Sequence, residues 1–258
     1  MDVEGTRPDP DSLLRSMKRA EVREKRGHLK IFFGMCAGVG KTYEMLRTAK
    51  EAMNRGVDAV VGYVETHGRM ETESLLQGLE TLPRLALVYH GVNLEEMDLD
   101  AILARKPMLV LVDELAHTNA PGSRHTKRYL DVLELLDSGI DVHTTLNVQH
   151  IESRADAVAQ ISGIIVRETV PDSVFERADE VEVIDLPPDE LLTRLSEGKV
   201  YSAERSERAL RHFFRRGNLT ALRQMALRLA AERVDAQMRE YLTTERIGRA
   251  LRPLVAGD

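Results

Sequence analysis

The fold of this chain is decided by residues 30–46, KIFFGMCAGVGKTYEML. The stretch begins with an apolar run at residues 31–33, passes through a glycine-rich segment and ends with helical spacing of its apolar residues. A buried strand, a glycine-rich turn and a helix start form the context in which G-x-x-x-x-G-K-[ST] binds phosphate. The end of that motif is present as GKT at residues 40–42. Gly34, however, lies one residue too early, and Met35 stands where the first glycine is expected.

The glycine-rich segment has the ingredients of a phosphate-binding loop. Backbone N–H groups of such a turn point at an anion, and the dipole of the following helix adds a favourable potential. We expect Lys41 to reach the β- and γ-phosphates of ATP and the Thr42 hydroxyl to bind Mg²⁺. A side chain in the left-handed backbone region costs about 1–2 kcal/mol, so we expect the neighbouring glycines to supply the freedom that Met35 lacks. The predicted nucleotide-binding residues of the loop are Gly34, Ala37, Gly38, Val39, Gly40, Lys41, Thr42 and Tyr43.

A second motif supplies carboxylates. The apolar run at residues 108–112 leads directly into Asp113 and Glu114. At the end of a buried strand, Asp113 is expected to hold Mg²⁺ through water, and Glu114 to orient or deprotonate an attacking water or hydroxyl. Two acids after a buried strand are common by chance, but their combination with the glycine-rich loop in one α/β chain favours a nucleotide site.

Polar residues elsewhere extend this candidate site. Open α/β sheets bind ligands at the carboxyl ends of their strands, and two further predicted strands end in polar clusters, at residues 65–69 and 144–149. From the second cluster we predict Asn147 and Gln149 as sensors of the γ-phosphate. From the loop at residues 117–125 we predict that Arg124 stabilises a phosphate in transfer.

Composition restricts the function. The chain has 258 residues and a net charge of −6, which disfavours sequence-independent nucleic-acid binding. Five Phe, six Tyr and no Trp leave few base-stacking side chains. The single cysteine, Cys36, fits a reducing compartment and is interpreted as a packing residue. No apolar run approaches the about 20 residues that cross a bilayer, and the polar N-terminus is unlike a signal peptide. We expect a cytoplasmic protein, or the cytoplasmic piece of a larger one.

Apolar runs that alternate with helical segments predict a three-layer α/β domain with a mostly parallel sheet and a C-terminal helical extension. We expect a lead-in and charged helix over 1–27, the α/β domain over 28–186 and a helical region over 187–258. The expected strands are 31–33, 59–64, 85–89, 108–112, 140–148, 164–167 and 180–184. The expected helices are 12–27, 41–55, 70–80, 94–104, 127–137, 149–161, 189–196, 203–215 and 219–247.

The last predicted helix carries an apolar stripe. Gly217 and Asn218 are expected to separate it from the preceding helix, with Asn218 as N-cap. Either the stripe packs on the α/β core, or it forms a homodimer or interdomain contact; the sequence leaves both open. The stripe residues are Leu222, Met225, Leu229, Val234, Met238 and Tyr241.

Several long motifs, in order, resemble the N-terminal cytoplasmic domain of KdpD-type sensor histidine kinases. They are GMCAGVGKTYEML, GYVETHGR, VDELAHTNAPGSRH with KRY, GIDVHTTLNVQHIES, RETVPDSV and EGKVY followed by FFRRGNLTALR. The resemblance covers about residues 6–240. It implies a P-loop NTPase-like domain that binds ATP and modulates the kinase and phosphatase output of a potassium-pump sensor. It also implies that the extra residue in the loop is a variant. The implied partners are other domains of such a sensor, or its potassium pump.

Three functions remain open. In the first, Mg²⁺ and ATP bind, with slow hydrolysis or none, and shift how the helical tail meets its neighbours. In the second, the same site transfers the γ-phosphoryl group to a protein hydroxyl or small molecule, with Glu114 as base. In the third, the chain is an interaction module whose loop holds a structural anion. The histidine-kinase catalytic core is not recognisable in the chain, so autophosphorylation is not assigned to it.

Overall fold

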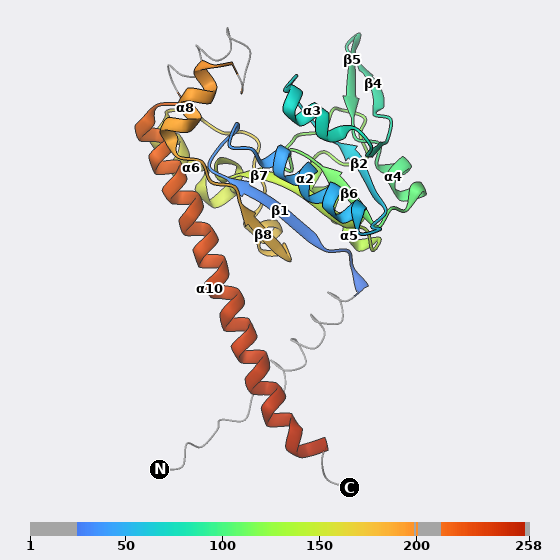
Figure 1. The fold of residues 1–258 in the computed structure, drawn as a ribbon, viewed down its shortest axis with the longest axis vertical. Helices are drawn as coiled ribbons and strands as arrows, with labels where there is room; N and C mark the ends of the chain where they lie inside the picture. The colour runs from blue at the N-terminus through green and yellow to red at the C-terminus, as the bar shows by residue number, and fades with distance from the viewer. Residues whose placement is uncertain (1–24, 199, 201–212, 256–258) are drawn as a thin grey trace.

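The computed structural model describes residues 25–198, 200 and 213–255. Most of the predicted helices at 12–27 and 203–215 therefore lie outside the described residues. The main sheet has six strands in the order β3-β2-β6-β7-β1-β8, and every neighbouring pair is parallel (Figure 1). The strands are β1 Leu29–Gly34, β2 Ala59–Tyr63, β3 Glu80–Thr81, β6 Leu109–Val112, β7 Asp141–Asn147 and β8 Glu180–Val183. The prediction of an α/β fold with a mostly parallel sheet is confirmed.

Helices cover both faces of the sheet. They are α2 Lys41–Asn54, α3 Met70–Leu76, α4 Leu99–Arg105, α5 Arg128–Asp137, α6 Ala155–Ser162, α7 Asp172–Glu176, α8 Pro188–Ser196 and α10 Arg216–Val255, with 3-10 turns η1 Val148–His150 and η2 Glu152–Arg154. Side chains along each strand alternate between two cores. Phe32 packs with α2 on one face, while Ile31 and Phe33 belong to the larger core on the other face. Burial on both faces is why β1, β2 and β6 are almost continuously apolar.

The strand register fixes the location of the site. Gly34, the last residue of β1, lies opposite Asn147, the last residue of β7. Val112, the last residue of β6, pairs with Thr144 of β7. The glycine-rich loop that follows β1 and the acidic pair that follows β6 therefore meet at one edge of the sheet.

The region between β2 and β6 departs from the sequence expectation. The apolar run at 85–89 is a strand, β4 Leu85–Tyr89, but it pairs antiparallel with β5 Val92–Glu96 in a separate hairpin. His90 and Gly91 connect the two strands, and both have positive φ (47° and 79°), as a tight two-residue hairpin turn requires. The predicted helix at 94–104 begins only at Leu99, where the Asp98 carboxylate caps it through the N–H of Ala101 at 2.9 Å.

The predicted strand at 164–167 is wrong. Gly163 ends α6 in the left-handed conformation, and the residues that follow it are irregular. Ile165 is 79% exposed, and Ile164 is also exposed, so no core burial holds this apolar pair in the sheet. The two short elements β3 and α7 were not predicted.

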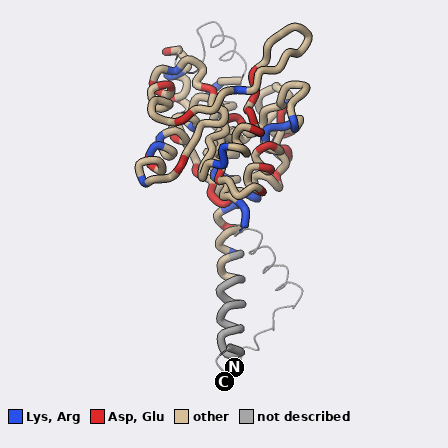
Figure 2. Tube along the Cα trace, turned by 90° about the vertical axis from the view of Figure 1, so that its right-hand side faces the viewer, with Lys and Arg blue, Asp and Glu red and all other residues tan. Residues whose placement is uncertain are grey.

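The C-terminal helix differs from the prediction at its start and along its stripe. α10 begins at Arg216, so Gly217 and Asn218 lie inside its first turn and Asn218 is not the N-cap. Its first part packs on the larger core through buried Leu219, Leu222 and Ala226. Farther along, α10 projects beyond the α/β body (Figures 1 and 2), and Val234, Met238 and Tyr241 are exposed. One stripe thus divides into a core-packed half and an exposed half.

The surface and the described helices agree with the composition. Acidic and basic residues are interspersed over the face drawn in Figure 2. Among the described residues, no helix is both long and apolar enough to cross a membrane.

Candidate functional site

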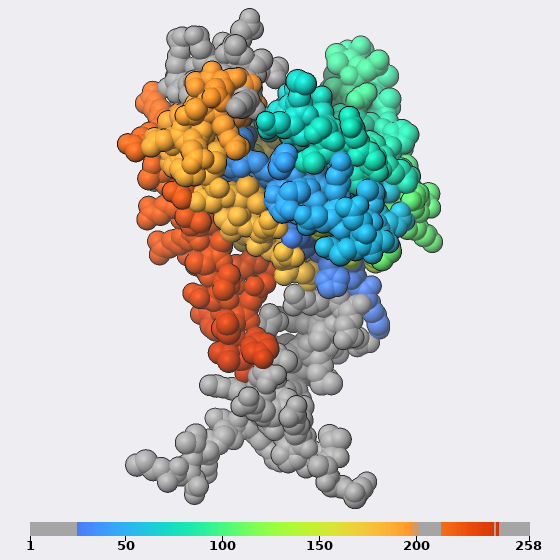
Figure 3. All heavy atoms as spheres, viewed as in Figure 1, coloured from blue at the N-terminus to red at the C-terminus, as the bar shows by residue number. Residues whose placement is uncertain are grey.

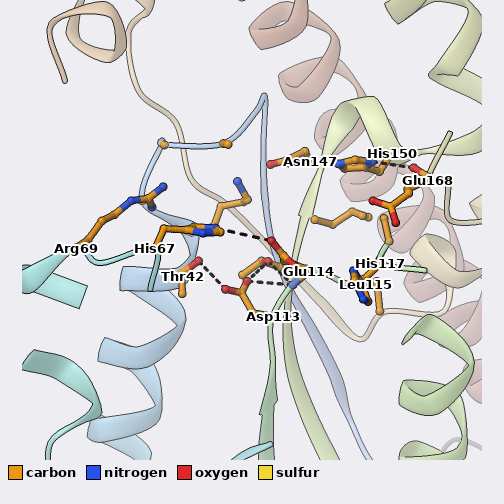
Figure 4. Close-up of a pocket in the computed structure, with 17 residues that line it drawn as sticks. Thr42, His67, Arg69, Asp113, Glu114, Leu115, His117, Asn147, His150 and Glu168 are labelled. Atoms are coloured by element: carbon orange, nitrogen blue, oxygen red, sulfur yellow. Dashed lines mark hydrogen bonds and ion pairs between the residues drawn. The ribbon is translucent and has the colours of Figure 1, made fainter. Parts of the chain in front are cut away.

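A cavity of about 140 Å³ lies at the carboxyl ends of β1, β6 and β7 (Figure 4). It is lined by residues of the glycine-rich loop, by the start of α2 and by the segment after β6. Further lining comes from the end of β7 and from the loop after β2. The parallel strand order brings these segments together from distant parts of the chain. The predicted site residues that line this cavity are Ala37, Gly38, Gly40, Lys41, Thr42, Asp113, Glu114 and Asn147.

The loop uses its glycines for two different purposes. Gly38 and Gly40 have φ of 90° and 106°, values that side-chain-bearing residues rarely adopt. Gly34 is instead needed for space, since a Cβ there would lie 2.8 Å from Val39 Cγ2 and 2.9 Å from the Ile184 carbonyl oxygen. Met35 is 2% exposed and is not among the described non-glycine residues with positive φ. The longer loop therefore holds Met35 in the core without left-handed strain.

Lys41 is buried at the start of α2. Its Nζ donates a hydrogen bond of 2.9 Å to the carbonyl oxygen of Cys36, within the loop. Burial lowers the pKa of Lys41 to about 8, while the Cys36 and Asp113 side chains oppose that shift and the charge of Arg69 adds to it. Burial also raises the pKa of the Cys36 thiol to about 12, so that thiol stays protonated at neutral pH.

Asp113 lies at the floor of the cavity and accepts hydrogen bonds from two threonine hydroxyls. The Thr42 hydroxyl donates a hydrogen bond of 3.0 Å to Oδ2 of Asp113, and the Thr145 hydroxyl of β7 donates to Oδ1. Asp113 is 2% exposed, so its carboxylate is held between two hydroxyls at the base of the cavity. Among the described residues, no group of three His, Cys, Asp or Glu side chains is arranged to hold a metal ion. A cation here would be held by this one carboxylate and the Thr42 hydroxyl, with further ligands from elsewhere.

Glu114 has an unusual backbone. Its φ is 57°, in the left-handed region, and its N–H donates to the Thr145 hydroxyl at 3.1 Å. Desolvation in the cavity and the neighbouring Asp113 charge raise the pKa of the Glu114 carboxyl, while Arg128, His67 and His117 act in the opposite direction. Glu114 Oε1 lies 3.8 Å from His67 Nε2. Figure 4 shows both side chains facing each other across the cavity.

A buried arginine lies beneath the acidic pair, and sequence reasoning missed it. Arg128, fully buried at the start of α5, donates to Glu96 at 3.0 Å and to the Asp113 carbonyl at 3.2 Å. Its guanidinium stacks 3.8 Å from the centre of the Tyr63 ring and lies 3.8 Å from Glu114 Oε2. Glu96 also accepts hydrogen bonds from His117 and the Ala120 N–H. The hairpin strand β5 is thus tied to the cavity floor.

A second, larger hollow of about 1180 Å³ adjoins the other side of the loop. Val39 and Tyr43 line it, and so does Arg194 of α8. Tyr43 is 42% exposed. The two hollows share Gly38, Gly40, His67 and Arg69, so a ligand that passes over the glycine-rich loop contacts both.

Three predicted residues, Gly34, Arg124 and Gln149, do not line either hollow. Gly34 is the last residue of β1. Arg124 is half exposed and pairs with Asp100 at 2.6 Å and with Glu134 at 2.5 Å. Gln149 lies in η1, with its amide 3.4 Å from the His150 ring. The arginine in the cavity is Arg69, which belongs to the polar cluster after β2. A polar run after a strand was the available signal for Arg69, but the sequence does not say which residue of the run faces the site.

Asn147 is placed where the sequence predicts it. It lines the cavity, and its Oδ1 is buried without a hydrogen-bond partner in the described part of the chain. His150 and Glu168 continue the wall beyond it, and the His150 ring is 2.7 Å from the Glu168 carbonyl oxygen (Figure 4). A buried polar atom without a partner is costly, which makes Asn147 a candidate for ligand contact.

Comparisons with known proteins identify the family. The model of the family described as KdpD, osmosensitive K⁺ channel His kinase sensor domain, matches residues 25–234. The sensor protein KdpD of Escherichia coli (strain K12) is 57% identical over 241 residues, which cover 93% of this chain and 26% of that protein. The sensor protein KdpD of Clostridium acetobutylicum is 54% identical over 92% of this chain and 26% of its own length.

A third relative, the putative sensor protein KdpD of Synechocystis sp. (strain PCC 6803), is 51% identical over 85% of this chain and 60% of its own length. The chain thus spans about a quarter of the length of the first two relatives. The match to the family model extends from the residues just before β1 into α10 and includes the whole cavity. This chain therefore belongs to the KdpD sensor domain family.

Proposed function

We propose that this chain binds ATP with Mg²⁺ at the glycine-rich loop, in the manner of a P-loop NTPase, and that binding regulates a KdpD-type sensor. One observation carries the proposal. The Thr42 hydroxyl and the Asp113 carboxylate are joined at 3.0 Å on the floor of a cavity at the carboxyl edge of a parallel sheet. A hydroxyl at a helix start and a carboxylate at the end of a neighbouring strand are the pair that holds Mg²⁺ in P-loop sites.

The charges of the cavity support a polyanion as the ligand. Lys41 and Arg69 both line it, and the charge of Arg69 contributes to the lowered pKa of Lys41. Two cations that disfavour each other gain from an anion placed between them. The left-handed Gly38 and Gly40 shape the loop in front of the N-terminus of α2, where backbone N–H groups favour phosphate.

The hollow beside Tyr43 supports a nucleotide rather than a bare phosphate. It adjoins the cavity through Gly38 and Gly40, and its lining includes the half-exposed Tyr43 ring together with Val39 and Ile184. Apolar and aromatic walls suit a nucleoside. We therefore assign the small cavity to the phosphates and the larger hollow to the nucleoside.

The residues around the proposed ligand have separate tasks. Bound Mg·ATP supplies a transferable terminal phosphoryl group. Lys41 and Arg69 neutralise phosphate charge, Thr42 and Asp113 hold the metal, and Asn147 donates or accepts at the far wall. Glu114, with its raised pKa, is placed to orient a water or hydroxyl and to take up its proton.

The test is calorimetric titration of the whole chain with Mg·ATP. Lys41→Ala is expected to weaken binding about 100-fold or more, because removal of a charge-assisted phosphate contact costs several kcal/mol. Lys50→Ala, on the same helix but outside both hollows, is the matched control and is expected to bind as the parent does. Equal affinity in the Lys41 variant, with its circular dichroism unchanged, contradicts the proposal.

A second candidate function is phosphoryl transfer to a protein hydroxyl or small molecule. Glu114 favours it, since a carboxylate with raised pKa and strained backbone at the cavity mouth is typical of catalytic groups. Incubation with γ-labelled ATP, alone and with cell extract, separates the cases. Label on protein supports transfer, free phosphate supports hydrolysis, and neither, with binding intact, supports regulatory binding alone.

We propose the partners that follow from the family. Other domains of a KdpD-type sensor, or its potassium pump, are the proposed recipients of the signal, on the cytoplasmic side of the membrane. A homodimer through the exposed half of α10, where Val234 and Met238 lie, remains a proposal for test by light scattering.

A further inference from the structure

The loop and the C-terminal region touch at a specific point. Val200, which is 2% exposed, packs over Gly38. A Cβ added at Gly38 would lie 2.7 Å from Val200 Cγ1 and 3.0 Å from Leu191 Cδ1 of α8. In Figure 3 the orange surface of α8 faces the cyan surface of α3 across a hollow whose floor is blue, the colour of the loop and α2. Leu191 and Val200, the two ends of segment 191–200, therefore both lie against the tip of the loop.

Arg69 connects the same segment to the cavity. Its Nη2 donates a hydrogen bond of 3.0 Å to the carbonyl oxygen of Val200. The same residue lines both hollows, and its charge acts on Lys41. Figure 4 shows the Arg69 side chain reaching from the α3 side toward the loop. One guanidinium thus lies between the C-terminal segment and the place where phosphate would bind.

We propose that Arg69 is a switch between two competing partners, the Val200 carbonyl and a bound nucleoside polyphosphate, so that nucleotide binding loosens segment 191–200 from the loop. The inference rests on the proposed function and names its regulation. A guanidinium–phosphate contact joins two full charges and is often bidentate, whereas the hydrogen bond from Arg69 to Val200 is single and has a neutral acceptor. Phosphate therefore displaces Val200 when both compete for Arg69.

Segment 191–200 is connected to the long helix α10 through the packing of α8. Leu191 and Leu195 of α8 and Leu219 and Leu222 of α10 share one buried core. Asp189 of α8 also pairs with Arg216, at the start of α10, at 2.9 Å. A change in how α8 sits on the loop is therefore transmitted to α10 by packing. In this proposal the coupled sites are the phosphate cavity and α10. Segment 191–200 connects them, because it lies against the loop without nucleotide and is loosened from it when nucleotide is bound.

The test is hydrogen–deuterium exchange of the peptide spanning residues 191–200 in the full chain. Without nucleotide, Arg69→Ala is expected to exchange about threefold to tenfold faster there than the parent, since it lacks the tether to Val200. In the parent, a saturating non-hydrolysable Mg·ATP analogue is expected to produce a similar increase. In Arg69→Ala the analogue is expected to add nothing. Arg105→Ala, which removes an exposed arginine paired with Asp58 and Glu80, is the matched control and is expected to behave as the parent does.

Calorimetry on the same samples separates the two levels of the proposal. If the analogue binds the parent but exchange at 191–200 stays constant or slows, the switch is overturned and nucleotide binding stands. If Arg69→Ala exchanges no faster than the parent without nucleotide, the tether is overturned. If the analogue does not bind the parent at all, both the nucleotide site and the switch are overturned.

Discussion

The Thr42 hydroxyl donates a hydrogen bond of 3.0 Å to Oδ2 of Asp113, although the two residues are 71 positions apart in the chain. The contact exists because β1 and β6 both flank β7 and run parallel to it, so the segments after them converge. Thr42→Ala removes the hydroxyl and is expected to abolish the part of nucleotide affinity that depends on Mg²⁺. Thr42→Ser keeps the hydroxyl and is expected to retain the Mg²⁺-dependent part of the affinity. Calorimetry with ATP, in Mg²⁺ and in EDTA, measures the difference, and an alanine variant with full Mg²⁺ dependence contradicts the assignment.

Nucleotide binding is expected to take up a proton at Lys41. The pKa of Lys41 is lowered to about 8, so at pH 8 about half of the molecules carry a neutral Lys41 amine. Bound phosphate favours the charged amine and raises that pKa. Binding therefore takes up about half a proton at pH 8 and almost none at pH 6, where Lys41 is already charged. Calorimetry in buffers of different ionisation enthalpy measures the uptake.

Lys41→Arg is the control for that measurement. An arginine stays charged throughout this range, so the uptake at pH 8 is expected to disappear even where binding persists. Uptake that is unchanged in the arginine variant assigns the proton to another group, such as Glu114.

The rate of any ATP turnover is expected to depend on pH through Glu114. A general base acts in its deprotonated form, so turnover rises as pH passes the pKa of Glu114, which lies above the ordinary value of 4.5. His67 lowers that pKa, so His67→Ala is expected to move the acid limb of the profile to higher pH. Glu114→Gln is expected to bind Mg·ATP normally and to release no phosphate. If Glu114→Gln releases phosphate at the parental rate, Glu114 is excluded as the base.

A pair of glycine substitutions separates backbone strain from crowding at the loop. Gly38 and Gly56 have nearly equal φ, 90° and 89°, but a Cβ meets Val200 within 2.8 Å at Gly38 and nothing within 4 Å at Gly56. Gly56→Ala is expected to cost about 1–2 kcal/mol of unfolding free energy from strain alone. Gly38→Ala is expected to cost about 1–3 kcal/mol more, from overpacking. Urea unfolding monitored by circular dichroism gives both values, and equal costs show that Val200 does not rest on the loop.

The central part of the fold was predictable from sequence. The apolar runs that became β1, β2 and β6 are buried along nearly their whole length, so their continuous hydrophobicity is a strong signal. The strands β7 and β8 include polar residues, and the edge strand β8 is only partly buried. The two motifs that flank the cavity follow β1 and β6 directly. Their convergence was predictable because ligand sites of parallel sheets lie at the carboxyl ends of the strands.

The remaining features depend on contacts that a single sequence does not show. The run at 85–89 has the composition of a sheet strand, and only the two positive φ values at His90 and Gly91 turn it into a hairpin. Arg124 and Arg69 both follow strands in polar loops, and tertiary packing alone decides that Arg69 faces the cavity. The burial of Arg128 and Glu96 was equally unpredictable, because charged residues are expected at the surface unless a partner is known.

Stability and the proposed activity are opposed at one position of this fold. Glu114 holds a left-handed backbone at φ 57° while it places a carboxylate at the cavity mouth. A glycine would adopt that conformation without the about 1–2 kcal/mol that a side chain adds there. A screen of the chain for thermal stability alone would therefore enrich glycine at position 114 and select against the carboxylate that we propose as the base. Thermostable variants of this domain are best sought with Glu114 held fixed.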